Sequence, residues 1–434
     1  MRDPSLSPTR DWLKGTVSGA NLRARISDPR DPSSIVFNLS AIPVEFMIFG
    51  LTLMGVAILT RRTLGVAVSG LVAVTLYKLA LAGFPAGPGF SGLFDHMAAE
   101  WVGLANLLLL LLGFALLAHQ FEMSKLPDAM PALLPNGWTG GAALLAMVFV
   151  MSIFLDNIAA ALVGGVIARH VYRNSVTIGF IAAIVAASNA GGAGSVIGDT
   201  TTTIMWINGV PPADIARAFV ASVVVLAIVA PIASWQQHCH APIVKHPSPG
   251  LQIEWRRVYA AAIILAAPVA ANILTNARFP DLSKHVPVIG LAIWAAIIAT
   301  LALSRPSFAV LKPAFKGAAF LLCLVLSASL MPVETLPRAS WPTTLGLGFL
   351  SAVFDNIPLT ALALRQGEYD WGFLAYAVGV GGSMLWFGSS AGVALTGLYP
   401  EGRSAVNWLR FGWYVPVAYV VGFLVMLALL GWHP

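Results

Sequence analysis

Residues 188–203 read SNAGGAGSVIGDTTTT and lie inside a long apolar block. This stretch contains four glycines: Gly191, Gly192, Gly194 and Gly198. Because each glycine in a helix interior costs about 1 kcal/mol relative to alanine, we expect residues 188–195 to interrupt a helix. Non-helical backbone at membrane depth is tolerated only where it is buried in protein or lines a cavity. The stretch therefore predicts a helix broken at a binding site.

The composition around this stretch is that of a membrane protein. The chain has 434 residues, of which 58% are hydrophobic and 10% are charged, and its mean hydropathy is +0.80. Soluble domains carry roughly 25% charged residues, so soluble enzymes, nucleic-acid binders and disulfide scaffolds are poor fits. A spanning helix needs about 20 apolar residues. We expect an all-α polytopic membrane protein in contact with the lipid bilayer, with no nucleic-acid partner and no enzymatic activity.

Apolar blocks alternate with short joints and fall into two halves. We expect a polar, disordered tail over residues 1–34, a first transmembrane repeat over 35–235, a polar loop over 236–256 and a second repeat over 257–434. The first half contains blocks 41–60, 63–84, 100–121, 138–172, 176–208 and 213–235; the second contains blocks 257–275, 286–304, 311–331, 341–366, 370–397 and 405–431. Six blocks in each half predict an internal duplication.

The fourth and fifth blocks of each half share motifs. Asp156-Asn157-Ile158 is matched by Asp355-Asn356-Ile357, and the Gly-Gly-x5-Gly pattern of Gly191, Gly192 and Gly198 is matched by Gly381, Gly382 and Gly388. Block 138–172 would be roughly 50 Å long as one helix, whereas the hydrocarbon core is about 30 Å thick. It is therefore expected to fold back as a re-entrant hairpin near Asp156, and the repeat extends that expectation to 341–366. Five crossings per half would make the repeats inverted.

Charged residues inside these blocks are candidates for function, since charges in a bilayer are rare. They are Asp156, Asp199, Asp355, Glu45 and Lys78. Asp199 precedes a run of threonines and follows open glycine carbonyls, and hard cations such as sodium prefer oxygen ligands. The alternative for the aspartates is helix capping. Glu45 is also compatible with hydration near an interface, and Lys78 with snorkelling to one face.

The run from Asn189 to Thr203 resembles the signature of NhaD-type sodium/proton antiporters. These belong to the ion transporter superfamily, which includes arsenite exporters and citrate or dicarboxylate carriers. Asp355-Asn356-Ile357-Pro358 and the stretch from Gly381 to Gly392 look like the second-half counterparts. The resemblance implies two inverted repeats, each with a hairpin and a broken helix, and often a homodimer that moves a transport domain against a scaffold.

Together, the residues and the resemblance assign an ion- or substrate-binding site. Its expected members are Asp156, Asn157, Ser188, Asn189, Asp199, Thr200, Thr201, Thr202, Asp355, Asn356, Thr360, Ser383, Ser389 and Ser390, with Asp199 and Asp355 as sodium ligands. One departure from the antiporter pattern lies at residues 159–161, where alanines replace threonines at the first hairpin tip.

The expected function is sodium/proton antiport, because a carboxylate that must lose its proton to bind sodium makes the two ions compete. A citrate or dicarboxylate carrier and an arsenite exporter are the alternatives. No cofactor is expected beyond the transported sodium and protons. The expected location is the bacterial inner membrane. Orientation stays open, since basic loop residues and the basic N-terminal tail argue for opposite faces.

Overall fold

The computed structural model describes residues 43–434, apart from residues 60–61, 85–86, 130–131, 133, 244–251, 280–281, 334–335 and 355. The expected tail 1–34, part of the expected loop 236–256, and Asp355 lie outside the described residues. Within the described part, every regular element is helical and none is a strand. The predicted all-α class is therefore confirmed.

Helices follow the predicted apolar blocks closely. The first half contains α1 (Val44–Ile58), α2 (Thr63–Tyr77), η3 (Lys78–Ala82), α3 (Gly89–Met123), α4 (Leu126–Ala129), α5 (Trp138–Phe154), α6 (Asn157–Val171), α7 (Ile178–Ala193), α8 (Thr200–Ile207), α9 (Pro212–Ala216) and α10 (Phe219–His240). The second half contains α11 (Trp255–Arg278), α12 (Leu282–His285), α13 (Val288–Ala299), η5 (Thr300–Ala302), η6 (Phe308–Val310), α14 (Leu311–Ser329), α15 (Trp341–Ser351), α16 (Asn356–Gln366), α17 (Trp371–Gly381), η8 (Gly382–Met384), α18 (Ser390–Leu398), η9 (Pro400–Gly402), α19 (Ala405–Phe411) and α20 (Tyr414–Leu430).

Five of the described helical segments are long and apolar enough to cross a membrane, and the bent pair α19 and α20 would make a sixth. The five are Thr63–Ala82, Gly89–Met123, Pro212–His240, Trp255–Thr275 and Phe308–Ser329. The chain is thus a multi-pass integral membrane protein. Fewer long helices are found than the ten predicted crossings, because breaks divide several apolar blocks into helices shorter than a span.

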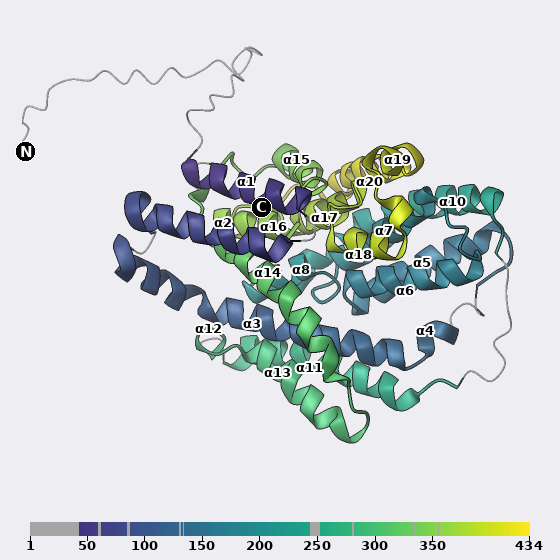
Figure 1. Ribbon diagram of the computed structural model, residues 1–434, viewed down its shortest axis with the longest axis horizontal. Coiled ribbons are helices and arrows are strands. Elements are labelled where there is room, and N and C mark those ends of the chain that lie inside the picture. Colours follow the sequence, from purple (N-terminus) through teal and green to yellow (C-terminus); the bar gives the residue numbers. More distant parts are fainter. Residues whose placement is uncertain are drawn as a thin grey trace, which may run out of the picture. The chain divides into compact units, whose positions relative to one another are not determined.

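Two short helices form the centre of the molecule. All residues from Gly179 to Ala193 of α7 and from Gly372 to Gly381 of α17 are buried. A helix that is apolar all round has no face for solvent and is covered on every side. Figure 1 shows α7, α8, α17 and α18 beside one another, and α7 packs against α5, α10 and α17. We call α5–α8, α10 and α15–α20 the core group.

The remaining long helices pack mainly on each other. Contacts join α1 to α2, α2 to α14, α14 to α3, α3 to α13 and α13 to α11. We call α1–α3, α11, α13 and α14 the wall group. The two groups meet where α14 packs against α16 and where α3 passes α8. The site described below lies at this meeting.

Helix α3 gives the molecule two ends. Its 35 residues extend about 52 Å at 1.5 Å per residue. We call the end where α3 finishes end A and the end where it begins end B. The C-terminal part of α6 faces Met123 and Lys125 at end A. The C-terminal turn of α16 lies at end B, where Arg365 pairs with Glu100 of α3.

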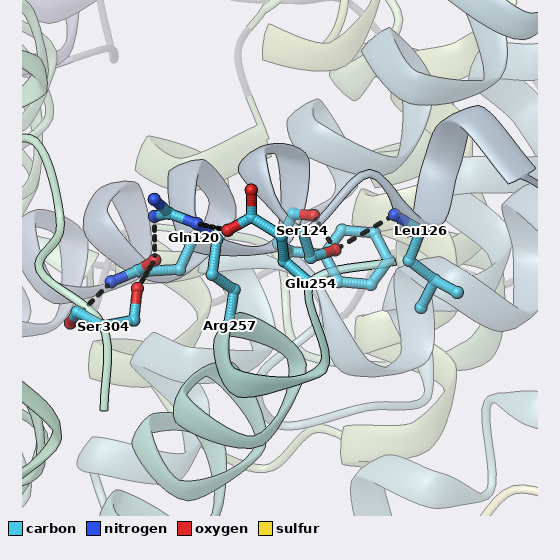
Figure 2. Close-up of polar contacts among 7 residues, drawn as sticks. Gln120, Ser124, Leu126, Glu254, Arg257 and Ser304 are labelled. Atoms are coloured by element: carbon cyan, nitrogen blue, oxygen red, sulfur yellow. Dashed lines mark hydrogen bonds and ion pairs between the residues drawn. The ribbon is translucent and has the colours of Figure 1, made fainter. Parts of the chain in front are cut away.

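Polar contacts fix α3 to α11 and to the segment after η5 at end A (Figure 2). The buried Gln120 accepts hydrogen bonds from Arg257 Nη1 at 2.9 Å and from Ser304 Oγ at 3.0 Å. Arg257 also binds Glu254 at 2.6 Å, and the backbone N–H of Glu254 donates to the carbonyl of Ser124. Each partner of the buried amide oxygen is therefore supplied by another segment, which holds this end of α3 in place.

Candidate functional site

Both predicted hairpin tips are helix breaks. Helix α5 ends at Phe154 and α6 begins at Asn157, as the Asp156-Asn157 motif predicted. In the second half α15 ends at Ser351 and α16 begins at Asn356. The N–H of Asn157 donates to the carbonyl of Gly198 at 2.9 Å. This bond joins the first tip to the break of the neighbouring helix.

The break in the fifth block begins later than predicted. Residues 188–193 are the last turns of α7, and the non-helical stretch runs from Gly194 to Asp199. In the second half α17 continues to Gly381, followed by the 3-10 turn η8. The prediction that the glycines at 191 and 192 unwind the helix was wrong, because their role is close packing.

The corresponding glycines of the two Gly-Gly-x5-Gly motifs contact corresponding backbone atoms in the two halves of the chain. A Cβ atom at Gly191 would clash with the carbonyl of Phe149 in α5, and one at Gly381 would clash with the carbonyl of Gly348 in α15. Gly192 and Gly382 in turn face the carbonyls of the third glycine in each motif, at 2.6 and 2.7 Å from the position of an added Cβ. The duplicated spacing therefore encodes one contact between a hairpin and a broken helix, built twice.

Asp199 is the N-cap residue of α8, directly before Thr200, and it also lies at the site. Its Oδ1 accepts a hydrogen bond from the N–H of Thr201 at 3.1 Å, so the predicted capping role is confirmed. Asp199 as a residue is 2% exposed, and its Oδ2 lies 3.4 Å from where a Cβ on Gly379 of α17 would stand. The nearest neighbour of such a Cβ would be Cβ of Ala193 at 3.2 Å, so glycine at position 379 eases the packing of α17 on α7 beside the carboxylate.

Several predicted hydroxyls serve the fold around the break. Thr202 Oγ1 donates to the carbonyl of Ser195, which closes the loop onto α8, and also to the carbonyl of Asp199 at 2.8 Å. Ser188 Oγ donates to Val185 O, and Thr360 Oγ1 donates to Asn356 O, each within its own helix. Thr201 is fully buried in α8. The structure thus does not place these four hydroxyls in the wall of the cavity described below.

Asn189 joins three parts of the site. Its Oδ1 accepts a hydrogen bond from Asn157 Nδ2 of the first tip at 3.1 Å. Its Nδ2 donates to Ser383 Oγ at 2.9 Å and to Ser389 Oγ at 3.0 Å, both in the second broken helix. Ser389 also caps α18 by accepting from Gly392 N. All four side chains were predicted from sequence, and the structure brings them together in one buried network.

A cavity of about 320 Å³ lies where the two groups meet. Its polar wall comes from the starts of α6, α8, α16 and α18, and its apolar wall comes from α3 and α14. The polar lining residues are Asp156, Asn157, Asp199, Thr200, Asn356 and Ser390. Four helix N-termini therefore face one space, and each presents N–H groups and the positive end of a helix dipole.

Asp156 and Asp199 are the charged side chains among the described residues that line this cavity. Helix N-termini stabilise carboxylates there without a fixed lysine or arginine. The expected ligand Asp355 precedes α16 and lies outside the described residues. Glu45 and Lys78 lie elsewhere: both are buried, and they form an ion pair with a separation of 3.8 Å. The predictions that Glu45 is hydrated near an interface and that Lys78 snorkels to one face were therefore wrong.

Sequence reasoning missed the helix wall and one glycine. Gly379 lies 190 residues after Asn189, the same offset that separates Gly381 from Gly191, so the duplication could have pointed to it. The α3 and α14 residues that close the cavity include Phe114, Ala118 and Gly317. These residues carry no charge or motif, and only the packing of the two groups shows their position.

Similar proteins are sodium/proton antiporters by name. The chain is 28% identical over 288 residues to Sodium/proton antiporter 1 of Arabidopsis thaliana, which covers 58% of this chain and 49% of the relative. It is 27% identical over 358 residues to the Na(+)/H(+) antiporter NhaD of Vibrio parahaemolyticus, covering 70% and 84%. The resemblance to NhaD-type antiporters is confirmed. The chain is also 26% identical to the Na(+)/H(+) antiporter NhaD of Vibrio cholerae, over 77% of the chain and 80% of the relative. No protein-family model matches the chain.

Proposed function

We propose that this chain is a secondary active transporter that exchanges sodium for protons by alternating access. The observation that carries the proposal is the pair Asp156 and Asp199, which line one cavity at the starts of two helices. Each carboxylate can hold either a proton or a sodium ion, so the two ions compete for one place. The names of the similar proteins support the same activity.

The absence of fixed cations in the described lining supports a mobile positive ion. The helix N-termini around the cavity favour ionised carboxylates, and no lysine, arginine or histidine stands among the described lining residues to neutralise them. The same N-termini would attract an organic anion. A di- or tricarboxylate entering the cavity, however, would be repelled by Asp156 and Asp199. Sodium or a proton therefore fits the charges better than citrate does.

The ends of the helices support inverted repeats with re-entrant hairpins. Helix α6 runs from the cavity to end A, and α16 runs from the cavity to end B, where Arg365 meets Glu100. Asp370 at the start of α17 pairs with Arg217 before α10 at 3.2 Å, whereas Thr177 at the start of α7 bonds Gln237 near the end of α10. Since α7 and α17 start at opposite ends of α10, the two broken helices run in opposite directions.

This arrangement supports alternating access in which the core group moves against the wall group. The polar half of the cavity belongs to the core group, and the apolar half belongs to α3 and α14. A shift of the polar half along an apolar surface breaks few hydrogen bonds. We propose the bacterial inner membrane as the location, and a homodimer as a further expectation that follows from the resemblance.

The direct test uses purified protein in proteoliposomes with an imposed pH gradient. Addition of sodium dissipates the gradient, addition of citrate does not, and Asp199→Asn abolishes the sodium response because it removes one of the two carboxylates on which the exchange depends. Asp95→Asn, an exposed aspartate of α3, is the matched control and keeps the response. Citrate uptake without sodium/proton exchange, or full exchange by Asp199→Asn, would reject the proposal.

A further inference from the structure

A second cavity adjoins the site. It has a volume of about 490 Å³ and lies between α3 and α6. It shares four lining residues with the site cavity: Ala115 and Ala118 of α3, and Ala159 and Leu162 of α6. Three of these four are alanines, so the shared boundary between the two cavities consists mostly of small side chains, with Leu162 as the one larger side chain among the four.

The two cavities continue in one direction. On α3 the lining advances from Leu111 in the site cavity to Met123 in the second cavity. On α6 it advances from Asp156 to Ile167. Both helices finish at end A, so the combined space leads from the carboxylates to that end.

Ionisable side chains line the outer part of the second cavity. Its lining includes His119, Glu122 and Lys125, and Nδ1 of His119 lies 4.0 Å from Oε2 of Glu122. The Glu122 side chain is 74% exposed. The Glu122 carboxylate offsets the ammonium of Lys125 in the same lining, so a cation that enters there meets no net positive charge from this pair.

End B of the interface is closed by polar contacts. Arg365 at the end of α16 pairs with Glu100 at 3.8 Å and donates to the carbonyl of Ser329 in α14. The buried His96 of α3 bonds Ser329 Oγ at 2.9 Å. Three helices are thus joined on this side of the site, whereas α3 and α6 are separated by a cavity on the other.

We propose that, in this conformation, ions travel between the two aspartates and end A through the passage between α3 and α6, with Ala115 and Ala118 as its wall on α3. The inference rests on the proposed function, because it assigns the route to that same site. The passage has Glu122 at its mouth and Asp156 at its inner end, so a cation meets a carboxylate on entry and on arrival.

Thiol labelling tests the passage without relying on transport. The background is Cys323→Ala, which retains the exposed Cys239 near the end of α10 as a marker. This terminus lies at end A, because Gln237 of α10 donates to the carbonyl of Ser175, just after the end of α6. Ala118→Cys is introduced, with Ala115→Cys as a second variant in case the first does not fold. A charged, membrane-impermeant methanethiosulfonate is added to right-side-out and everted vesicles, and each thiol is quantified by mass spectrometry.

The thiol introduced at position 118 is expected to react only in the vesicle orientation in which Cys239 reacts. Ala105→Cys is the matched control, because Ala105 is a similarly half-buried alanine of α3 that lines a separate apolar cleft. Since the thiolate is the reactive form and is disfavoured in apolar surroundings, labelling at 118 should exceed labelling at 105 by about tenfold.

Two outcomes would overturn the passage. One is failure of both Ala118→Cys and Ala115→Cys to react while Cys239 does, and the other is equal reaction in both vesicle orientations. Labelling as expected in a protein that shows no sodium/proton exchange would reject the proposed function and leave the passage standing. Sodium/proton exchange by a protein whose introduced thiols do not react would reject the passage and leave the proposed function standing.

Discussion

At the residue scale, Asn189 connects the two halves of the molecule at the site. Its amide bonds Asn157 of the first hairpin tip and two serines of the second broken helix, all of them buried. A buried amide that loses its partners leaves them unsatisfied, which is more unfavourable than the loss of an exposed bond. The same residue also holds the polar wall of the cavity in position, so we expect both the stability and the proposed transport to depend on it.

We therefore predict that Asn189→Ala lowers the free energy of unfolding by about 1–3 kcal/mol and reduces sodium/proton exchange. Asn208→Ala is the control, because Asn208 is exposed at the end of α8 and bonds only the nearby carbonyl of Ile204 among the contacts described. Its effect should stay within about 0.5 kcal/mol. Thermal melting in detergent measures both variants, and equal melting shifts would contradict the role of the network.

At the element scale, the hairpins and broken helices pack through glycine in both halves. A Cβ atom at Gly198 would clash with the carbonyl of Ser152 at the end of α5, and one at Gly388 would lie 2.5 Å from the carbonyl of Ala352 after α15. These neighbours are backbone atoms, which cannot turn aside as a flexible side chain can. The breaks can therefore lie against the tips only if these positions lack a side chain.

Gly198→Ala and Gly388→Ala should each destabilise the protein by about 1–3 kcal/mol, as overpacking of a dense interior does. The control is Gly346→Ala in α15, since no heavy atom lies within 4 Å of an added Cβ there. Melting temperatures in detergent compare the three variants. If Gly198→Ala has the same melting temperature as Gly346→Ala, the close approach of the break to the hairpin tip is not required for stability.

At the scale of the whole molecule, the core and wall groups are joined unequally at their two ends. Glu100 and Arg365 join them at end B, and a cavity separates α3 from α6 at end A. The two side chains are 37% and 25% exposed, so solvent screening limits the pair to at most about 1 kcal/mol. Even so small a contribution changes the ratio of two conformations by about fivefold.

We predict that Glu100→Gln shifts the protein away from this conformation, because the proposed sliding of the two groups breaks the pair. Labelling of Ala118→Cys from end A should then fall by up to about fivefold. Glu368→Gln removes an exposed carboxylate from the segment between α16 and α17 and should leave labelling unchanged. Unchanged labelling in Glu100→Gln would show that the ion pair does not favour this state.

Much of the site could be predicted because its residue types conflict with their surroundings. Aspartates such as Asp156 and Asp199 are unfavourable in apolar blocks unless they have a function, and repeated glycines are unfavourable in helices unless close packing requires them. The wall from α3 and α14 could not be predicted, since residues such as Ala118 and Gly317 are ordinary in an apolar helix. The pairing of Glu45 with Lys78 was likewise invisible, because it depends on how α1 packs against α2 and η3.

The sequence by itself determined that this is an all-helical membrane protein with duplicated breaks and with acids at those breaks, because hydropathy, glycine spacing and charge are properties of the chain alone. Tertiary structure alone decided which break faces which tip, where the helix resumes, and which apolar helices close the cavity. Those outcomes depend on close packing between segments far apart in sequence. Whether a small residue such as Ala118 lines a passage or fills a core is set by what lies opposite it.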